Sequence, residues 1–365
     1  MAATKLPDRI RDYVVTRLLG KGGMGEVFLA DHPLLLRHVA IKRFVFAAGK
    51  GDDEDTAQQR FLREGQALAR LTHHNIVQVH DLFEHKKQTF MVLEYVDGFD
   101  LSALLGQGAL PVDVACIIAL KVAEALEHAH FTGIVHRDVK ASNVMMSRQG
   151  DVKLMDFGIA KQDLLDPMTR TGMVVGTPIY VAPEVLAGGD ADARSDLYAL
   201  GTLMYLMLSG RRPFEHANSE NLFALILSGR YPRLGKVAKH VPWRLRSIVQ
   251  RLMEKKPDKR FTSAAELRQT LEVFLAEEGV AAHHAERLVR FLESQGKLTQ
   301  EEVTRWLEGP AEAAGITAAA RPTRRWGRWA FAAVLLAGVG AAVWFGVLDG
   351  LLGQWLAWAE SLPPR

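Results

Sequence analysis

Cysteine is nearly absent from this chain of 365 residues, which contains Cys116 and no other. A single thiol excludes a disulfide framework and any zinc site built from several cysteines. Excess charge is also lacking, because 45 basic residues against 42 acidic ones give a formal net charge of +3. This balance argues against a nucleic-acid partner bound through bulk charge. With 48% hydrophobic residues, the chain can bury a sizeable core and is not a disordered polymer.

The N-terminus lacks the apolar stretch of a secretory signal. Residues 1–12 are polar and include Lys5, Arg9 and Arg11, so they are interpreted as an N-terminal extension. From residue 13 to residue 274, apolar runs alternate with glycine, proline and charged turns. This texture is typical of a globular domain.

The chain changes character after this domain. Residues 275–309 are predicted to be a helical juxtamembrane segment, and residues 310–328 an Ala/Pro/Arg linker. Residues 329–348 hold no charged residue, and at about 1.5 Å per residue they would span roughly 30 Å, the thickness of a bilayer's hydrocarbon core. A buried core helix is the alternative, but a helix over these residues would be apolar on every face. We therefore expect a transmembrane helix.

The flanks of this apolar segment set its orientation. Arginines stand at positions 321, 324, 325 and 328, immediately before it, and five of the seven tryptophans lie between Trp326 and Trp358. The positive-inside rule places residues 1–328 in the cytoplasm and residues 349–365 outside, as a short extracytoplasmic tail. We expect a single-pass protein of the cell (inner) membrane that contacts the lipid bilayer through residues 329–348.

A glycine-rich loop lies near the start of the globular domain. Gly20, Gly22 and Gly25 form a G-x-G-x-x-G pattern, in which backbone N–H groups can approach phosphate oxygens closely. A Rossmann turn would open a helix, but residues 26–30 alternate like a strand. The pattern therefore predicts a hairpin lid between two strands.

A lysine and a glutamate are predicted to meet behind this lid. Lys42 lies on an apolar strand, and Glu64 falls on the inner stripe of a helix predicted over residues 60–71. Because a carboxylate on a buried face needs a cation or hydrogen bonds, we expect Glu64 to pair with Lys42 and to orient its ammonium group toward phosphates. The alternative is an edge lysine that reaches solvent.

Two further motifs supply the chemistry of phosphoryl transfer. Residues 136–143 read H-R-D-x-K-x-x-N, and a D-F-G triplet follows at residues 156–158. Phosphoryl transfer needs a proton acceptor, cations that spread the charge of the γ-phosphate, and oxygen ligands for Mg²⁺. The residues that match these needs are Asp138, Lys140, Asn143 and Asp156.

Together these motifs resemble the bacterial, membrane-anchored form of the Hanks-type (eukaryotic-like) serine/threonine protein kinases. The resemblance covers about residues 13–274 and implies an α+β bilobal fold, with a small β-rich N-lobe and a large helical C-lobe. It also implies transfer of the γ-phosphate of ATP to Ser/Thr hydroxyls of proteins, with Mg²⁺ or, in its place, Mn²⁺. Lys140, two residues after Asp138, is typical of the serine/threonine class rather than the tyrosine class.

The resemblance assigns a role to each site residue. Asp138 would be the catalytic base, Lys42 would contact the ATP phosphates and be fixed by Glu64, and Asn143 with Asp156 would hold Mg²⁺. Leu93 would be the gatekeeper beside the adenine. The other expected nucleotide contacts are Leu19, Gly20, Gly22, Gly25, Val27, Ala40 and Met145, together with the backbone of Glu94 and Val96.

Further residues would hold the site together. Residues 176–184 resemble the substrate-docking end of an activation segment and include Thr177. Glu184 would pair with Arg260, and Asp196 would anchor the catalytic loop. An apolar stack expected in active kinases would consist of Leu68, Val79, His136 and Phe157, the last followed by Gly158.

The resemblance also suggests how the chain is regulated. Arg137 precedes the base and would bind an anion, and a phosphothreonine at Thr169 or Thr171 could supply it. We expect activation by autophosphorylation between two copies. In the predicted membrane helix, small residues recur every four positions, at Gly338, Ala342 and Gly346, which favours a homodimer.

Two other functions compete with this interpretation. Small-molecule phosphotransferases share the set of Asp, Asn and Asp site residues. That interpretation, however, would not account for residues 176–184 and the Arg260 that matches them. A pseudokinase scaffold would usually lack one of the chemical residues, and here Lys42, Asp138, Asn143 and Asp156 are all present.

Overall fold

The structure is a computed structural model, and it describes residues 6–22, 25–44, 62, 64–86, 88–158, 178–216 and 218–308. The chain divides into two units, residues 1–309 and residues 310–365. The linker, membrane helix and tail predicted after residue 309 lie outside the described residues, as do Thr169, Thr171 and Thr177. Within the described part, no helix is long and apolar enough to cross a bilayer.

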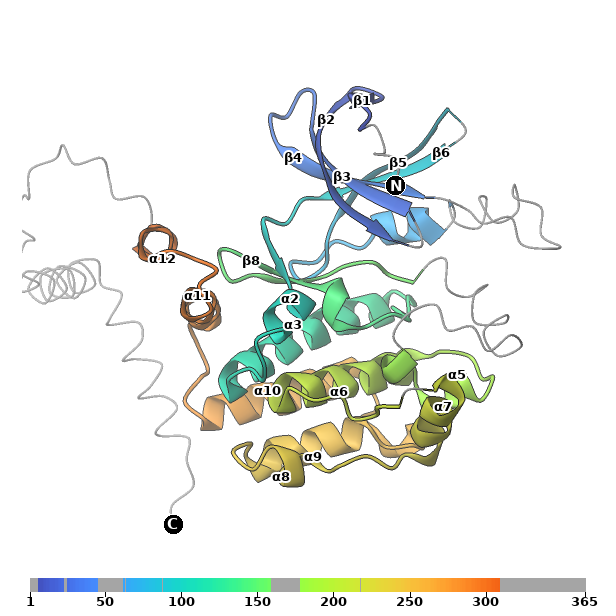
Figure 1. Cartoon of the computed structure of the whole chain (residues 1–365), viewed down its shortest axis with the longest axis vertical. Coiled ribbons are helices and arrows are strands. Elements are labelled where there is room, and N and C mark those ends of the chain that lie inside the picture. Colours follow the sequence, from blue (N-terminus) through green and yellow to red (C-terminus); the bar gives the residue numbers. More distant parts are fainter. Residues whose placement is uncertain are drawn as a thin grey trace, which may run out of the picture. The chain divides into compact units, whose positions relative to one another are not determined.

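An antiparallel sheet of six strands forms the upper lobe (Figure 1). Its strand order is β1-β2-β3-β4-β6-β5, and every neighbouring pair is antiparallel. The strands are β1 (Arg9–Ile10), β2 (Tyr13–Gly22), β3 (Gly25–Asp31), β4 (His38–Phe44), β5 (Val79–His85) and β6 (Gln88–Glu94). β2 and β3 form a hairpin whose innermost Cα partners are Gly22 and Gly25, so the predicted glycine-rich hairpin is present.

Side-chain alternation on β4 gives this sheet two different faces. Val39 and Ile41 are fully buried in a small cluster on one face. Ala40 and Phe44 join the main core, and Lys42 shares their parity along the strand. Because successive strand residues point to opposite faces, this register turns Lys42 toward the rest of the molecule rather than toward the outer cluster.

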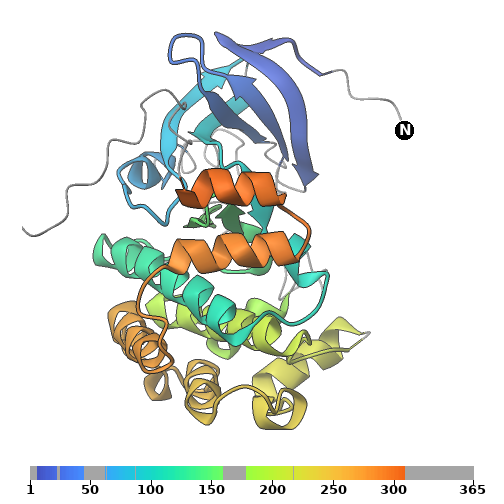
Figure 2. The same cartoon turned by 90° about the vertical axis from the view of Figure 1, so that its left-hand side faces the viewer.

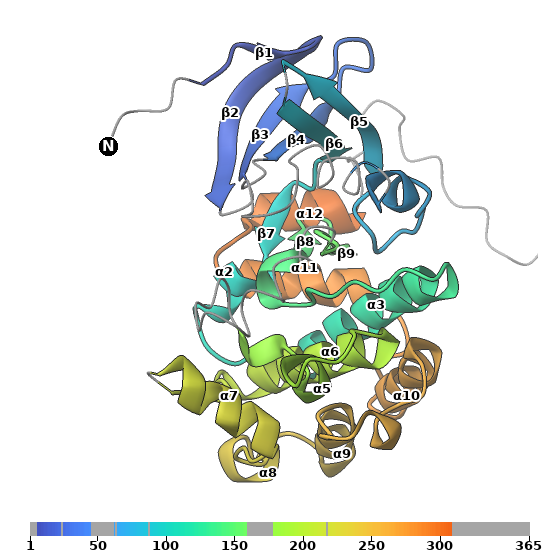
Figure 3. The ribbon, with the colours of Figure 1, turned by 90° about the vertical axis from the view of Figure 1, so that its right-hand side faces the viewer.

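Helices form the lower lobe, and a second, three-stranded sheet lies between the lobes (Figures 1 and 3). The small sheet consists of β7 (Gly98–Asp100), β8 (Val144–Ser147) and β9 (Val152–Leu154). The α-helices after β6 are α2 (Leu101–Leu105), α3 (Val112–Phe131), α5 (Pro183–Leu186), α6 (Ala193–Ser209), α7 (Ser219–Ser228), α8 (Leu234–Val237), α9 (Trp243–Leu252), α10 (Ala264–Glu277), α11 (His284–Ser294) and α12 (Gln300–Glu308). Short 3₁₀ turns are η1 (Ala141–Asn143), η2 (Pro178–Tyr180) and η3 (Pro257–Lys259).

The two longest helices are the centre of the lower lobe. α3 carries apolar residues on most of its surface, and twelve of its twenty residues are buried, Cys116 among them. α6 begins at a capping box. The Asp192 carboxylate accepts a hydrogen bond from the backbone N–H of Ser195, and the Ser195 hydroxyl oxygen accepts one from the backbone N–H of Asp192. The helix ends at Gly210, whose φ of 64° lies in the left-handed region that glycine tolerates.

These observations confirm the predicted bilobal α+β fold with a β-rich N-lobe and a helical C-lobe. The N-lobe sheet has a small core of its own, whereas one continuous core joins its inner face to the C-lobe helices. The glycine-rich hairpin and Lys42 therefore belong to the N-lobe sheet, whereas the H-R-D and D-F-G motifs lie outside it, beside β8 and β9.

A buried ion pair ties the lower lobe together. Arg260 has a fully buried side chain, and its two terminal nitrogens donate to the two carboxylate oxygens of Glu184 at 2.7 and 2.6 Å. The guanidinium group also donates to the carbonyls of Arg194 and Glu254, and the Ser195 hydroxyl donates to Glu184 at 3.0 Å. This network joins α5, the start of α6 and the turn before α10, and its Glu184–Arg260 pair is the one that the family resemblance implies.

Replacing Arg260 with alanine is expected to lower the free energy of unfolding by about 3–5 kcal/mol, because the largely buried Glu184 carboxylate would lose its cation. Equilibrium denaturant unfolding measures this change. The matched control is Arg244→Ala, which removes an exposed arginine that pairs with Glu277 and should leave the midpoint unchanged. Equal midpoint shifts in the two variants would contradict the importance of the buried pair.

Candidate functional site

A cavity of about 420 Å³ lies between the N-lobe sheet and strands β7 and β8 of the three-stranded sheet. Its walls come from both lobes and from the segment that connects them. The lining residues are Arg17, Leu19, Gly20, Val27, Ala40, Lys42, Val77, Leu93, Glu94, Tyr95, Val96, Gly98, Phe99, Asp100, Ala103, Ser142, Met145, Met155 and Asp156.

Most residues predicted to contact the nucleotide line this cavity. They are Leu19, Gly20, Val27, Ala40, Lys42, Glu94, Val96 and Met145, with the expected gatekeeper Leu93 beside them. Gly22 and Gly25 lie farther out, at the turn of the β2–β3 hairpin. The structure thus brings the adenine-side residues together, and it places the last two glycines where a hairpin lid would extend beyond the cavity.

Lys42 connects the two lobes through its ammonium group. Its Nζ lies 2.7 Å from Oδ1 of Asp156, and the lysine side chain is 12% exposed. Asp156 has a φ of 56°, in the left-handed region that Asp tolerates better than most residues. A largely buried cation is therefore held at the floor of the cavity by the aspartate of the D-F-G triplet.

Glu64 lies on a helix that packs against β5 and β6, the latter being the neighbour of the Lys42 strand. Residues 64–69 are helical, and Glu64 is half-buried. The next residue is glycine, and a Cβ there would lie 2.6 Å from Cδ2 of Leu82 and 3.5 Å from Met91, the β6 partner of Lys42. Glycine thus permits this close approach of the helix to β5 and β6. The Lys42–Glu64 contact itself stays a prediction.

The catalytic loop gathers a second group of polar side chains. Lys140 Nζ donates to Oδ2 of Asp138 at 2.8 Å. Asn143 Nδ2 donates to the same oxygen at 3.0 Å and to the backbone carbonyl of Asp138 at 2.8 Å. One carboxylate oxygen of Asp138 is thereby fixed by two donors, which sets the direction of the other oxygen.

Asp196 positions this loop from α6. Its carboxylate accepts from the backbone N–H groups of His136 and Arg137, both at 2.8 Å, and lies 2.8 Å from Nε2 of His130. Asp196 is 1% exposed, so these partners satisfy a buried charge. Arg137 has a φ of 63°, and the bonds to Asp196 hold it in this uncommon conformation.

The aromatic rings of the two motifs pack against each other. The centroids of His136 and Phe157 are 4.4 Å apart. His136 is fully buried, and this burial lowers the pKa of its imidazole, so the ring is neutral near pH 7. Leu68 and Val79 are buried in the same core. The four residues of the predicted apolar stack therefore belong to one packed region.

Backbone hydrogen bonds join the H-R-D and D-F-G motifs directly. The N–H of Met155 donates to the carbonyl of Asn143 at 2.9 Å, and the N–H of Gly158 donates to the carbonyl of His136 at 2.8 Å. In addition, Nε2 of His136 bonds the carbonyl of Met155 at 3.1 Å. Asn143 and Asp156 are thus held beside each other.

These residues fit a magnesium ion that arrives with its nucleotide. Among the described residues, no group of three His, Cys, Asp or Glu side chains could hold a metal. Mg²⁺ bound with phosphates, however, needs one or two carboxylates and completes its shell with phosphate oxygens and water. The Asn143 amide nitrogen is committed to Asp138, so the Asn143 amide oxygen and the Asp156 carboxylate are the groups that could accept a cation.

Several cavity residues were not anticipated from the sequence. They are Arg17, Val77, Tyr95, Gly98, Phe99, Asp100, Ala103, Ser142 and Met155. Most lie within three residues of a predicted contact, so a wider window around each motif would have found them. Asp100 could have been found from the sequence as a helix N-cap, a position that Asp favours. It caps α2 and accepts from the N–H of Ala103 at 3.0 Å.

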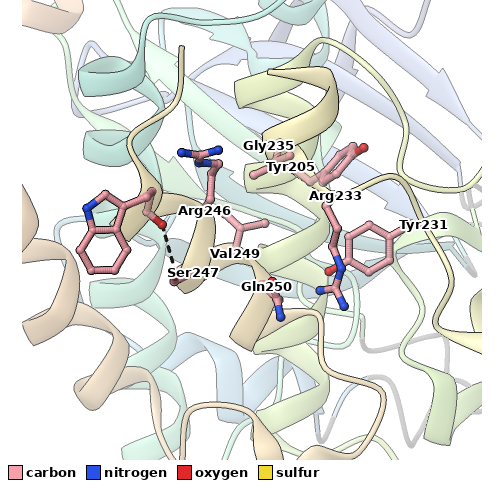
Figure 4. Close-up of a pocket in the computed structure, with 10 residues that line it drawn as sticks. Tyr205, Tyr231, Arg233, Gly235, Arg246, Ser247, Val249 and Gln250 are labelled. Atoms are coloured by element: carbon pink, nitrogen blue, oxygen red, sulfur yellow. Dashed lines mark hydrogen bonds between the residues drawn. The ribbon is translucent and has the colours of Figure 1, made fainter. Parts of the chain in front are cut away.

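A second cavity, of about 340 Å³, lies in the lower lobe between α6, α8 and α9 (Figure 4). Its lining residues are Tyr205, Tyr231, Arg233, Leu234, Gly235, Trp243, Arg246, Ser247, Val249 and Gln250. No carboxylate lines it, so it offers neither a general base nor a metal ligand of that kind. Lys42 and Asp156, by contrast, line the cavity between the lobes.

Comparison with known proteins agrees with this geometry. The family model described as "Protein kinase domain" matches residues 13–272. Serine/threonine-protein kinase PksC of Streptomyces coelicolor is 42% identical over 268 residues, which are 70% of this chain and 48% of the relative. Serine/threonine-protein kinase Pkn1 of Myxococcus xanthus is 38% identical over 277 residues, 74% of this chain and 39% of the relative.

A solved structure gives the same result for the fold. The crystal structure of the Mycobacterium tuberculosis PknI kinase domain matches with a TM-score of 0.58 and 31% identity, over 75% of this chain and 99% of that domain. The chain spans less than half the length of the curated relatives named above. From the family match and the site geometry together, we conclude that the chain belongs to the protein kinase family, with a kinase domain of the bacterial Hanks type.

Proposed function

We propose that the chain is an ATP-dependent serine/threonine protein kinase that acts at the cell membrane. The main support for this proposal is that the H-R-D and D-F-G motifs are hydrogen-bonded to each other. Hydrogen bonds between residues 136–143 and residues 155–158 hold Asp138, Asn143 and Asp156 in one cluster, and Lys42 reaches that cluster from the other lobe. This is the set of groups that phosphoryl transfer requires.

Each side chain has a distinct task in this proposal. Lys42, held by Asp156, supplies positive charge to the phosphates, and the apolar walls from Val27, Ala40 and Met145 enclose the adenine. The Asp138 carboxylate, held by Lys140 and Asn143, accepts the proton of the hydroxyl group of the protein substrate. When bound, Mg²⁺ supplies the charge that neutralises the γ-phosphate, and Asn143 with Asp156 would hold it.

Serine and threonine hydroxyls of proteins are the proposed acceptors. The curated relatives with the most similar sequences bear the name serine/threonine-protein kinase, and Lys140 stands beside the base, as in that class. The Glu184–Arg260 pair supports a docked activation segment, which a small-molecule phosphotransferase would not need.

The proposed location rests on the sequence of residues 310–365. The charge-free stretch at residues 329–348, preceded by four arginines, supports a single membrane helix with the kinase domain in the cytoplasm and the C-terminus outside. Anchoring concentrates the chain in two dimensions, and the small residues Gly338, Ala342 and Gly346 favour a homodimer. Such proximity supports phosphorylation of Thr169 or Thr171 by a second copy, with Arg137 as the proposed binding partner of the new phosphate.

Asp138→Asn is expected to lower the rate of phosphate transfer to a generic basic protein by about 10²–10⁴-fold, because the variant cannot accept the hydroxyl proton. Labelled ATP and Mg²⁺ provide the measurement, and the matched control is Asp258→Asn, an exposed aspartate on η3. Label found only on small molecules would indicate a small-molecule phosphotransferase, and absence of transfer by the wild type would indicate a pseudokinase.

Thr169→Ala/Thr171→Ala is expected to abolish the rise in activity that follows preincubation with ATP, because no phosphate can then form in the activation segment. The measurement compares initial rates before and after preincubation, together with phosphopeptide mapping. Activity equal to that of the preincubated wild type from the first turnover would show that activation does not require these threonines.

Leu336→Arg/Val343→Arg is expected to release the chain from membranes washed with alkaline carbonate. Each arginine near the centre of a membrane helix costs about 2.5–3.5 kcal/mol of insertion free energy. Leu351→Arg/Leu352→Arg, just beyond the predicted span, serves as the control and should remain in the pellet. Recovery of both variants in the same fraction as the wild type would contradict the anchor at residues 329–348.

A further inference from the structure

Two helices that follow the matched kinase domain pack at the junction between the lobes. The family model ends at residue 272, whereas α11 (His284–Ser294) and α12 (Gln300–Glu308) continue beyond it. Figure 2 shows both helices, in orange, lying across the junction below the N-lobe sheet. Their position places them beside the hinge, by which we mean residues 94–100, from the last residue of β6 to the end of β7.

Burial shows that the helices are part of the folded domain. Leu288, Val289, Phe291 and Leu292 of α11 and Val303 of α12 are buried in the main core. The two helices join at Gly296, whose φ is 65°. We call residues 284–308 the C-terminal hairpin.

The hairpin contacts the turn that follows β8. A Cβ at Gly150 would lie 2.4 Å from the carbonyl oxygen of Ala285 on α11, and Gly150 has a φ of 86°. Both facts require glycine at this position. The β8–β9 turn and the start of α11 are therefore in direct backbone contact.

Arg148 extends this contact to the hinge. Its guanidinium group lies 2.8 Å from Oε1 of Glu302 on α12 and 3.4 Å from Oδ1 of Asp97 in the hinge. Its backbone N–H also donates to the carbonyl of Asp97 at 3.0 Å. One arginine thus links the hairpin to the segment that connects the lobes.

The same cation lies over a wall of the nucleotide cavity. The Arg148 guanidinium is 5.4 Å from the ring centroid of Phe99, and Lys297, in the turn of the hairpin, places its Nζ at the same distance from that ring. Phe99 lines the cavity, and its Cα partner Met146 is next to Met145, another lining residue. Cation–π contacts at this range help to fix the position of the ring.

Glu302 is preorganised for this role. Its second oxygen accepts from the N–H of Thr299 at 2.8 Å, and the Thr299 hydroxyl accepts from the N–H of Glu302 at 3.3 Å. This is a capping box at the start of α12. One carboxylate oxygen therefore fixes the helix end while the other is aimed at Arg148.

We propose that the C-terminal hairpin braces the hinge, and that Arg148, held by Glu302, is a positioning residue for ATP through Asp97 and Phe99. The proposal rests on the proposed nucleotide site. It implies that any partner or modification that displaces α12 would weaken ATP binding without touching the catalytic loop. The other anchor of the hairpin, the 3.0 Å pair between Arg287 and Asp113 on α3, does not reach the hinge.

Glu302→Gln in the full chain tests the brace. Glutamine keeps the capping box but loses the charge that holds Arg148. We expect the Kd and the KM for ATP to rise about two- to fivefold, the range that loss of a half-exposed ion pair gives, with kcat unchanged. The matched control is Glu286→Gln, which removes an ion pair with Arg290 within α11 and should leave both constants unchanged.

A double-variant cycle isolates the coupling. Arg148→Gln alone should raise the Kd for ATP, and adding Glu302→Gln to it should cause no further rise, because the two substitutions remove one contact. Additive effects would overturn the proposal, as would an unchanged Kd in Glu302→Gln. A wild-type chain that binds ATP but transfers no phosphate would refute the proposed kinase activity and leave the brace intact, since direct binding of ATP measures the brace. A wild type that binds no ATP would overturn both.

Discussion

The rest of the site depends on the hydrogen bonds that the Asp196 carboxylate accepts. This carboxylate is buried, and buried charge is tolerated because two backbone N–H groups and a histidine surround it. Those bonds fix the backbone of His136 and Arg137, and His136 in turn binds the segment of the D-F-G triplet through its ring and its carbonyl. One carboxylate therefore positions the backbone next to Asp138, the proposed proton acceptor, and through His136 the segment that carries Asp156, a proposed cation ligand.

A second constraint acts between the lobes. Lys42 comes from a strand of the N-lobe sheet, and Asp156 comes from the segment after β9. Strand alternation sends the lysine to the correct face, and the left-handed backbone of Asp156 turns its carboxylate to meet it. Because each partner belongs to a different lobe, a change in the angle between the lobes would change this distance.

The sequence predicted those parts of the site that consist of residues close together in the chain. The glycine hairpin, the polar residues of the catalytic loop and the wall residues around Met145 are each specified by neighbours in the chain, and the structure places them where the spacing suggested. Contacts made by residues distant in sequence were harder to predict. The aspartate partner of Lys42 is 114 positions away, and the Arg148–Glu302 pair is 154 positions apart. Periodicity indicated a helical segment after residue 275, but it carried no signal for the surface on which those helices would pack.

The scarcity of cysteine has a practical consequence that follows from where the single thiol lies. Cys116 is in the middle of α3, fully buried, and burial raises its pKa well above the usual thiol range, so little thiolate forms and reagents cannot reach it. The folded domain should therefore be insensitive to oxidants that act on exposed thiols. A cysteine introduced on the surface would be the one reactive thiol, so a spectroscopic probe could be attached to a chosen lobe without first removing a native residue.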